Sequence, residues 1–325
     1  MSRYLISVVI PLYNKRSYIS RSIDSVLNQN DCDVEIIVVD DGSTDGSADL
    51  VAKIACENSN IRLIKKGNGG AASARNVGVR AAHGEYVAFL DADDELKIGA
   101  ISTYRKMIDK FPYAGAFGIN FSFVKNGIEF RKHQPELLNG LAIQRVDYFE
   151  GISKGGWYLT SSSTCAKRSM LIDVGLFDEK LVQREDPHMW YRLALVSPVI
   201  FCKDVYALYH LDPDQRVCTI HKAVSEFADN LLLMQYIDDG LLSASQTVAA
   251  KKIISSGYVA QATQNLQVEN LEEAKRAMSK ASLLFSSNRY HYCVVYFLCH
   301  TGTWRLINPI LKLRKQIIGL SNKEI

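Results

Sequence analysis

The chain has 325 residues, of which 47% are hydrophobic and 22% are charged, and its formal net charge at pH 7 is +3. These values exclude collagen-like, coiled-coil and wholly disordered chains. A charge so near zero also argues against a nucleic-acid-binding protein, which would present a basic face. The seven cysteines form no Cys-x-x-Cys pair, so they indicate neither a disulfide framework nor a zinc site. We therefore expect a globular protein of a reducing compartment.

The chain shows no export or membrane-spanning signal. The apolar run 5–11 is too short for a signal peptide, and no stretch approaches the roughly 20 apolar residues that span a bilayer. These observations predict a cytoplasmic protein, bound at most peripherally to the inner face of the cell membrane.

The first hundred residues alternate between two hydrophobic periods. Near-continuous apolar runs predict buried strands over 7–12, 34–39, 61–64 and 86–90. Apolar residues at helical spacing predict helices between them, near 18–27, 50–54 and 71–82. Such alternation is typical of a Rossmann-like, mostly parallel sheet with helices on both faces, which binds ligands at the carboxyl ends of its strands.

Later residues have a different texture. Shorter strands are expected over 114–124, 163–167 and 199–201, with a helix over 186–195. From about residue 223 the pattern is helical throughout. We therefore predict one α/β domain over 1–220, with halves 1–105 and 106–220, followed by a helical C-terminal region over 221–325.

Polar clusters follow three of the predicted strands, at Tyr13-Asn14, Asp40-Asp41 and 91–94. Within the third, Asp91 and Asp93 flank a small residue, so both carboxylates can turn toward one Mg²⁺ or Mn²⁺ ion. The alternative is a turn whose aspartates only cap a helix. Because so many carboxylates at one sheet edge would repel each other without a cation or a donor-rich ligand, we favour a binding site.

A glycine-rich turn, Gly67-Asn-Gly-Gly-Ala-Ala72, satisfies a permissive dinucleotide-binding pattern. It follows the third strand rather than the first, and the acid expected near the ribose belongs to the carboxylate cluster. We therefore interpret it as a flexible turn that leads into the helix over 71–82. Arg75 in that helix could face either a phosphate or the carboxylates.

Two adjacent acids, Glu185 and Asp186, open the helix over 186–195. Acids at this position are first of all helix caps. Pro187 fits the first helical position, which would make Asp186 the N-cap. A capping aspartate can still act as a general base where substrate reaches it.

Taken together and in this order, these segments resemble family 2 glycosyltransferases with the GT-A fold. The matching motifs are SVVIPLYN at 7–14, EIIVVDDGSTD at 35–45, GAASARN at 70–76, GEYVAFLDADD at 84–94, GLFD at 175–178 and ED at 185–186. The resemblance covers roughly residues 5–200 and does not reach the helical C-terminal third. It implies a GT-A fold with a helical C-terminal appendage.

The resemblance also implies a nucleotide-sugar site made of Pro11, Tyr13, Asp41, Arg75, Asp91 and Ala92. Tyr13 would stack on the nucleobase, and Asp41 would accept a hydrogen bond from the base N3–H, which favours a UDP-sugar. Arg75 would approach the diphosphate, and Asp91 would lie near the ribose or the metal.

For the chemistry, the resemblance implies that Asp93, with Asp91, binds Mn²⁺ or Mg²⁺ and that Asp186 is the catalytic base. Pro187 stands where the family tends to carry a small or acidic residue. A single base without a covalent nucleophile predicts inversion at the anomeric carbon. The expected acceptor is a hydroxyl of a glycan or of a polyprenyl-diphosphate-linked sugar, as in bacterial surface-polysaccharide synthesis (O-antigen, capsule or lipopolysaccharide).

Two other functions would require different residues. A nucleotidyltransferase would need a glycine-rich basic loop after the first strand, and Tyr13-Asn-Lys-Arg16 has no glycine. A binding or scaffold protein on a degenerate transferase fold would be expected to have lost a metal-binding or catalytic carboxylate. For the acceptor, Trp157, Tyr158 and 161–164 are candidate sugar-facing groups, with core packing as the alternative for Trp157.

The C-terminal tail predicts an amphipathic helix between Asn308 and Gly319, and residues 301–325 carry a net charge of +4. This helix either packs on the preceding helical segment or lies on an anionic membrane surface. The second possibility predicts peripheral membrane contact through residues 304–320.

Overall fold

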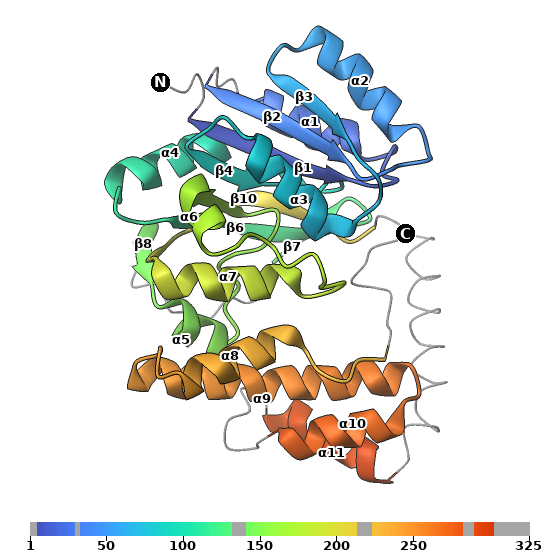
Figure 1. Ribbon diagram of the computed structural model, residues 1–325, viewed down its shortest axis with the longest axis vertical. Coiled ribbons are helices and arrows are strands. Elements are labelled where there is room, and N and C mark those ends of the chain that lie inside the picture. The colour runs from blue at the N-terminus through green and yellow to red at the C-terminus, as the bar shows by residue number, and fades with distance from the viewer. Residues whose placement is uncertain (1–4, 30–32, 132–140, 213–222, 282–288, 302–325) are drawn as a thin grey trace. The chain divides into compact units, whose positions relative to one another are not determined.

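The structure, a computed structural model, describes residues 5–29, 33–131, 141–212, 223–281 and 289–301 (Figure 1). The chain divides into two compact units, residues 1–215 and 216–325.

Unit 1 is built on a mixed sheet whose strands run in the order β3-β2-β1-β4-β9-β6-β10-β5, with β7 paired to β6 and β8 paired to β10. The first four in this order are β3 (Ile61–Lys65), β2 (Val34–Asp40), β1 (Ile6–Leu12) and β4 (Tyr86–Phe89), all parallel. The predicted Rossmann-like strands are confirmed, and each differs from its expected bounds by one residue at one end.

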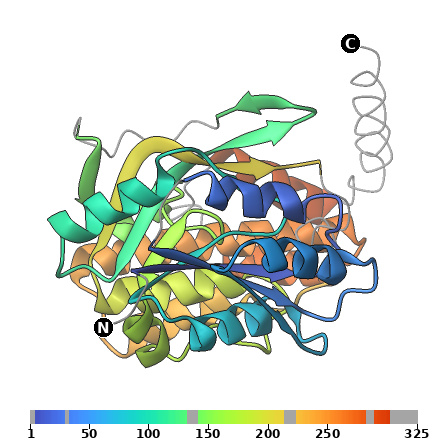
Figure 2. The same cartoon turned by 90° about the horizontal axis from the view of Figure 1, so that it is seen from above.

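Helices cover both faces of this parallel part. They are α1 (Ile19–Leu27), α2 (Ser47–Glu57), α3 (Gly70–Ala81) and α4 (Ala100–Lys110). Alternate strand residues such as Ile6 and Val8 share one core with α1, α2 and α4. Val9 points the other way, toward Gly78 of α3, where a Cβ atom would meet Val9 Cγ1 at 2.3 Å. Figure 2 shows α1 and α4 on one side of the strands and α3 on the other.

The second half of unit 1 has more irregular pairing. Its strands are β5 (Glu95–Leu96), β6 (Ala116–Lys125), β7 (Ile128–Phe130), β8 (Ile143–Val146), β9 (Thr164–Lys167) and β10 (Val199–His210). Its helices are α5 (Tyr148–Ser153), α6 (Arg168–Asp173) and α7 (Glu185–Val196). β9 runs antiparallel between β4 and β6, and β10 pairs with β6 in parallel with register shifts between Cys202 and Ala207. The expectation of a three-residue strand at 199–201 was wrong, because β10 continues through these irregularities to His210.

Unit 2 is helical within the residues that the structure describes. Its helices are α8 (Ala228–Asp238), α9 (Ala244–Gln267), α10 (Leu271–Lys280) and α11 (Arg289–Thr301). Ser243 starts α9 with a capping box, in which its side chain and Gln246 exchange hydrogen bonds with each other's backbone. None of the described helices is long and apolar enough to cross a membrane. The tail predicted to contact membrane, residues 304–320, lies outside the described residues.

The cysteines that the structure describes are all free thiols. Cys56 of α2 and Cys293 of α11 are exposed, whereas Cys165, Cys202 and Cys299 are buried. Burial raises the pKa of the three buried thiols.

Candidate active site

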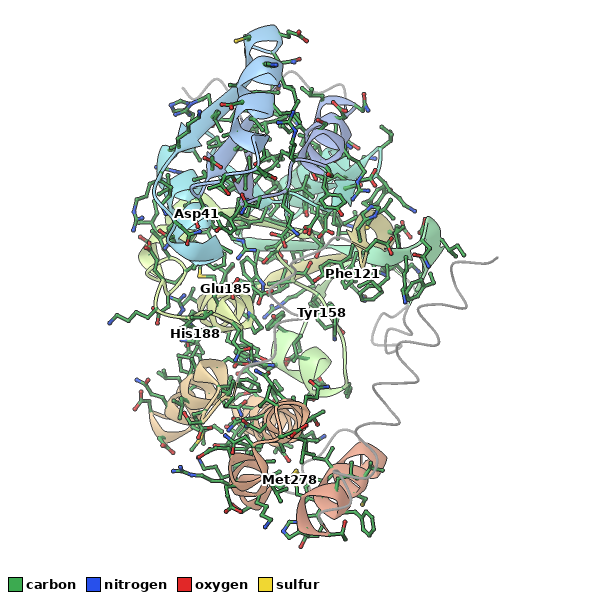
Figure 3. All side chains as sticks on the ribbon, turned by 90° about the vertical axis from the view of Figure 1, so that its right-hand side faces the viewer. Asp41, Phe121, Tyr158, Glu185, His188 and Met278 are labelled. Atoms are coloured by element: carbon green, nitrogen blue, oxygen red, sulfur yellow. The ribbon has the colours of Figure 1, made fainter. Side chains whose placement is uncertain are left out.

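The carboxyl ends of β1, β2 and β4 meet at one edge of the sheet. The parallel register sets Leu12 of β1 opposite Asp40 of β2, and Val9 opposite Phe89 of β4. The segments that follow these strands, beginning at Tyr13, Asp41 and Leu90, therefore lie at the same edge. Figure 3 views unit 1 from the side to which these strands point in Figure 1.

Asp91 and Asp93 each form an ion pair at this edge. Asp91 Oδ1 lies 2.8 Å from Arg75 Nη2, and Asp93 Oδ2 lies 2.9 Å from Lys15 Nζ. Arg21 Nη2 donates to the backbone carbonyl of Asp93 at 2.6 Å. The expectation that this carboxylate cluster needs a bound cation or ligand was incomplete, because the chain itself supplies cations from α1, α3 and the loop after β1.

Arg75 links the two acidic segments. Its guanidinium is buried, with Nη2 on Asp91 and Nη1 on Glu185 Oε1 at 2.9 Å, and it lies over the Phe177 ring at 5.6 Å. Burial alone would lower the pKa of Arg75, but the carboxylates of Asp91 and Glu185 raise it. Its Nε has no hydrogen-bond partner among the described residues. Arg75 therefore ties α3, the loop after β4 and the start of α7 together.

Asp186 is the second residue of α7, after Glu185. The expectation that Asp186 is the N-cap and Pro187 the first helical residue was wrong. Arg184 adopts a left-handed conformation (φ 60°) and is the N-cap, and its carbonyl accepts the first helical bond from the His188 N–H. Pro187 is tolerated as the third residue because the amides of the first turn have no partners inside a helix.

The ionisation of Asp186 is shifted toward neutral pH. Burial and the neighbouring Glu185 raise its pKa to about 7, while Arg75 opposes them. A carboxyl group with such a pKa can exchange protons near pH 7. Asp186 directly follows Glu185, which Arg75 connects to Asp91.

Asp41 is buried and fully engaged. Its carboxylate accepts from Lys66 Nζ at 2.5 Å and from the backbone N–H groups of Gly69 and Gly70, at 2.9 and 2.7 Å. These amides belong to the start of α3, so Asp41 satisfies donors that the helix leaves unpaired. The turn at 67–72 thus binds a carboxylate of the chain itself, which agrees with its interpretation as a turn that leads into α3.

Pro11 and Tyr13 lie at the end of β1. Pro11 is tolerated in this central strand because β4 pairs with β1 only from Ile6 to Val9. Tyr13 is 47% exposed. Asn14 follows with a positive φ of 51°, and its side-chain oxygen accepts from the Thr44 N–H at 2.8 Å. The loops after β1 and β2 are therefore joined directly.

A buried network that the sequence did not reveal supports the acidic loop. Asp94 accepts from Ser162 Oγ at 2.5 Å and from the His210 N–H at 2.9 Å, and Ser162 Oγ also accepts from the Asp91 N–H at 3.1 Å. Burial, with Asp91 and Asp93 nearby, raises the pKa of Asp94. Ala92, between Asp91 and Asp93, is buried. The only sequence signal for the network was a third aspartate directly after Asp93.

Comparisons with known proteins identify the family of this chain. A family model described as glycosyl transferase family 2 matches residues 7–168. Glycosyltransferase GlyG of Streptococcus pneumoniae serotype 4 is 32% identical over 223 residues, which are 63% of this chain and 70% of that protein. The chain belongs to glycosyl transferase family 2.

This glycosyltransferase also resembles longer and more distant proteins. Chondroitin synthase of Pasteurella multocida is 32% identical over 200 residues, which are 59% of this chain but only 19% of that enzyme. The crystal structure of S. aureus TarS 1-349 in complex with UDP-GlcNAc matches with a TM-score of 0.69 at 18% identity, covering 92% of each chain. The glycosyltransferase therefore has the predicted GT-A fold, and the family assignment argues against a nucleotidyltransferase or a scaffold.

A second solved structure shows how far the fold alone reaches. Mannosyltransferase PcManGT from Pyrobaculum calidifontis, in complex with GDP-Man and Mn²⁺, matches with a TM-score of 0.52 at 16% identity, covering 93% of this chain and 86% of that one. Neighbours of the same fold thus hold different nucleotide sugars. The preference for one nucleobase must therefore depend on the particular residues of this glycosyltransferase.

The candidate acceptor groups separate into two kinds. Trp157 is 47% exposed, whereas Tyr158 is buried with its ring 5.0 Å from that of Phe201. Residues 161–164 are buried as well, and Ser162 is occupied with Asp94. The expectation that Tyr158 and 161–164 face a sugar was wrong for this structure, because their side chains support the acidic loop and the core instead.

Proposed function

We propose that this glycosyltransferase moves a sugar from a UDP-sugar to a hydroxyl of a glycan or of a polyprenyl-diphosphate-linked sugar, with inversion at the anomeric carbon. The observation that carries the proposal is Asp186, whose pKa is raised to about 7 and whose neighbour Glu185 is tied through Arg75 to Asp91. This connects a base of suitable pKa to the predicted nucleotide-sugar site.

For the donor, Tyr13 is available to stack on a nucleobase, since almost half of its surface is exposed. Asp41 would accept the N3–H of uracil in addition to, or in exchange for, the donors that it already binds. As an acceptor that matches the N3–H donor of uracil, Asp41 supports UDP as the leaving group.

The predicted divalent metal fits the residues present. Asp91 and Asp93 offer hard oxygen ligands, as Mn²⁺ and Mg²⁺ prefer. Arg75 pairs with one carboxylate oxygen of Asp91, and Lys15 pairs with one carboxylate oxygen of Asp93. Within the part of the chain that the structure describes, no group of three or more potential ligands forms a complete metal site, so diphosphate oxygens would have to complete the coordination. When bound, the ion would stabilise the negative charge that develops on the leaving diphosphate.

The chain's own residues account for the remaining steps. Asp186 would remove the proton from the acceptor hydroxyl as that oxygen attacks the anomeric carbon. Arg75 donates hydrogen bonds to Asp91 and Glu185. It would therefore hold the loop after β4 in a fixed position relative to the start of α7, which carries Asp186. Attack from the face opposite to the leaving group, without a covalent intermediate, inverts the configuration.

The acceptor and pathway follow from the relatives by analogy. Proteins named chondroitin synthase and hyaluronan synthase match this chain, which supports a polysaccharide as the product. A cytoplasmic enzyme whose basic tail, 304–320, contacts the inner face of the membrane could reach a lipid-linked acceptor.

The test is a panel of nucleotide sugars, with UDP or GDP release measured in the presence of Mn²⁺ and lipid-linked sugar acceptors. We expect UDP-sugars to be used and chelation by EDTA to stop turnover. Asp93→Ala should abolish transfer and weaken Mn²⁺ binding in the presence of UDP, measured by electron paramagnetic resonance. Asp24→Ala, which removes an exposed aspartate from α1, is the control. Unchanged turnover in metal-free buffer would refute the metal's role.

A further inference from the structure

Five aromatic rings pack together at the far end of the sheet in unit 1. We call Phe121, Phe123, Phe130, Trp157 and Tyr209 the aromatic cluster. Phe123 is its centre, with ring centroids 5.4 Å from Phe121, 5.6 Å from Tyr209, 5.8 Å from Phe130 and 6.1 Å from Trp157. The rings come from β6, β7, β10 and the segment before β9, so they form one continuous surface.

Part of this surface is open to solvent. Phe121 and Phe123 are buried, but Trp157 is 47% exposed and Phe130 is 39% exposed. Ile128, in the same short strand as Phe130, is 69% exposed. Two large, partly exposed rings therefore pack on the buried Phe123. Exposed apolar side chains gathered in this way are typical of a binding site.

The aromatic cluster is connected directly to the acidic loop. Tyr209 is followed by His210, whose N–H donates to Asp94. Trp157 lies five residues before Ser162, which bonds both Asp94 and the Asp91 N–H. Two segments therefore run from the rings to the groups that hold Asp91 and Asp93.

Figure 3 labels Phe121 of the aromatic cluster together with Asp41 and Glu185. In this view Phe121 lies to the right of Glu185 at the start of α7, whereas Asp41 lies above Glu185. An acceptor must bring its hydroxyl to Asp186 without displacing the nucleotide. The side occupied by the aromatic cluster is where the rest of such an acceptor would extend.

The chemistry of the rings favours a carbohydrate. A pyranose ring carries its C–H groups on one face and its hydroxyls around the rim, and a flat aromatic side chain contacts that apolar face while the hydroxyls stay hydrated. Trp and Tyr offer large apolar surfaces at little conformational cost. Both exposed rings pack on Phe123 of β6, which holds them beside the sheet and suits contact with a flat sugar ring.

We infer that the aromatic cluster is the acceptor-binding surface of this glycosyltransferase and that it takes a pyranose ring of a glycan acceptor, with Trp157 and Phe130 as the contacting rings. The inference rests on the proposed function, because it assumes that Asp186 acts on a hydroxyl of that acceptor.

The experiment uses the full chain saturated with UDP and Mn²⁺. Saturation-transfer NMR would be recorded with methyl β-D-glucopyranoside, methyl β-D-galactopyranoside and methyl N-acetyl-β-D-glucosaminide as probes, and with sorbitol as a hydroxylated probe that has no pyranose face. We expect transfer to the ring C–H protons of at least one pyranoside and none to sorbitol. Trp157→Ala and Phe130→Ala should each weaken that binding at least tenfold. Tyr113→Ala, which removes an exposed ring just before β6, should leave it unchanged.

Calorimetry of UDP binding separates the two levels of failure. Loss of UDP binding by the unmodified protein would refute the proposed function itself. Normal UDP binding with no pyranoside binding, or pyranoside binding that survives both ring substitutions, would overturn the inference alone. Binding of phosphatidylglycerol vesicles or self-association that Trp157→Ala abolishes, without pyranoside binding, would also overturn it and assign the aromatic cluster to a membrane or a second copy. Unchanged melting temperatures of the variants would show that they remain folded.

Discussion

In the first half of unit 1 four parallel strands carry mostly apolar sequences, and the polar groups at their ends are paired within the chain, as Asp41 is with Lys66 and Arg75 is with Asp91. In the second half the strands pair in both directions, β10 has register shifts, and the partly exposed side chains include the rings of Trp157 and Phe130. The first half thus holds charges in fixed positions, which would suit the charged diphosphate of a nucleotide sugar. The second presents an apolar surface, which can differ among enzymes that use different acceptors.

The largest effect on activity should come from Asp186, which is an exception to this difference between the halves. Asp186 belongs to the second half but is proposed to act by its charge. Asp186→Asn should lower kcat by about 10²–10⁴-fold, because it removes the general base, while UDP affinity measured by calorimetry stays unchanged. Asp109→Asn, at an exposed position of α4, is the control. A kcat within a few-fold of the unmodified enzyme would mean that the base lies elsewhere.

The next effect tests how strongly Arg75 joins the halves. Arg75→Ala leaves Asp91 and Glu185 without their cation, and removing one partner of a buried pair typically costs about 3–5 kcal/mol. Because both acids keep some access to water, we expect the lower end, about 3 kcal/mol, in the free energy of unfolding measured with urea.

Arg80→Ala in the same helix is the matched control for Arg75. Arg80 is 59% exposed and lies 4.0 Å from Glu179, so its loss should change stability by less than about 1 kcal/mol. Equal effects of the two substitutions would show that Arg75 is not a structural link between the halves.

A smaller effect follows from the pKa of Asp186. The base must be ionised, and burial raises its pKa to about 7. The value of kcat/KM should therefore fall about tenfold for each pH unit below 7 and level off above it. Glu185 also raises this pKa, so Glu185→Gln should move the acid limb to lower pH. A flat profile between pH 5 and 8 would contradict the assignment.

The smallest effect concerns the base of the donor. Asp41→Asn should weaken UDP binding by about tenfold, because a hydrogen bond to a charged acceptor is typically worth about 1.5–3 kcal/mol, and it should reduce the preference for UDP over GDP. Asp49→Asn, an exposed position in α2, provides the control. Tighter binding of GDP than of UDP by the unmodified protein would refute the choice of donor.

The sequence predicted the first half well because its signals are local. Three of the four parallel strands, such as Val34–Asp40, are mostly apolar and buried on both faces, and the apolar residues between the strands recur at helical spacing. The meeting of Tyr13, Asp41 and Asp91 at one edge follows from parallel order alone. The positions of these strands in the sequence could therefore be predicted without knowing which strands they pair with.

The remaining parts depend on contacts between distant residues. Ser162 and His210 reach Asp94 across 68 and 116 positions, and no local pattern predicts such a contact. The start of α7 was misplaced because a left-handed Arg184, rather than the proline, determines where the helix begins. The aromatic cluster was missed for the same reason, since its rings come from four separate segments.

The distribution of thiols offers a way to watch the enzyme at work. Thiolate is the reactive form of cysteine, so the buried Cys165, Cys202 and Cys299, with their raised pKa values, should be inert to maleimides. Cys56 is exposed in unit 1 and Cys293 in unit 2. Once Cys32 and Cys218, outside the described residues, are replaced by serine, one dye could be attached in each unit. Energy transfer between the dyes would then report the distance between the two labelled cysteines while the nucleotide sugar and the glycan acceptor bind.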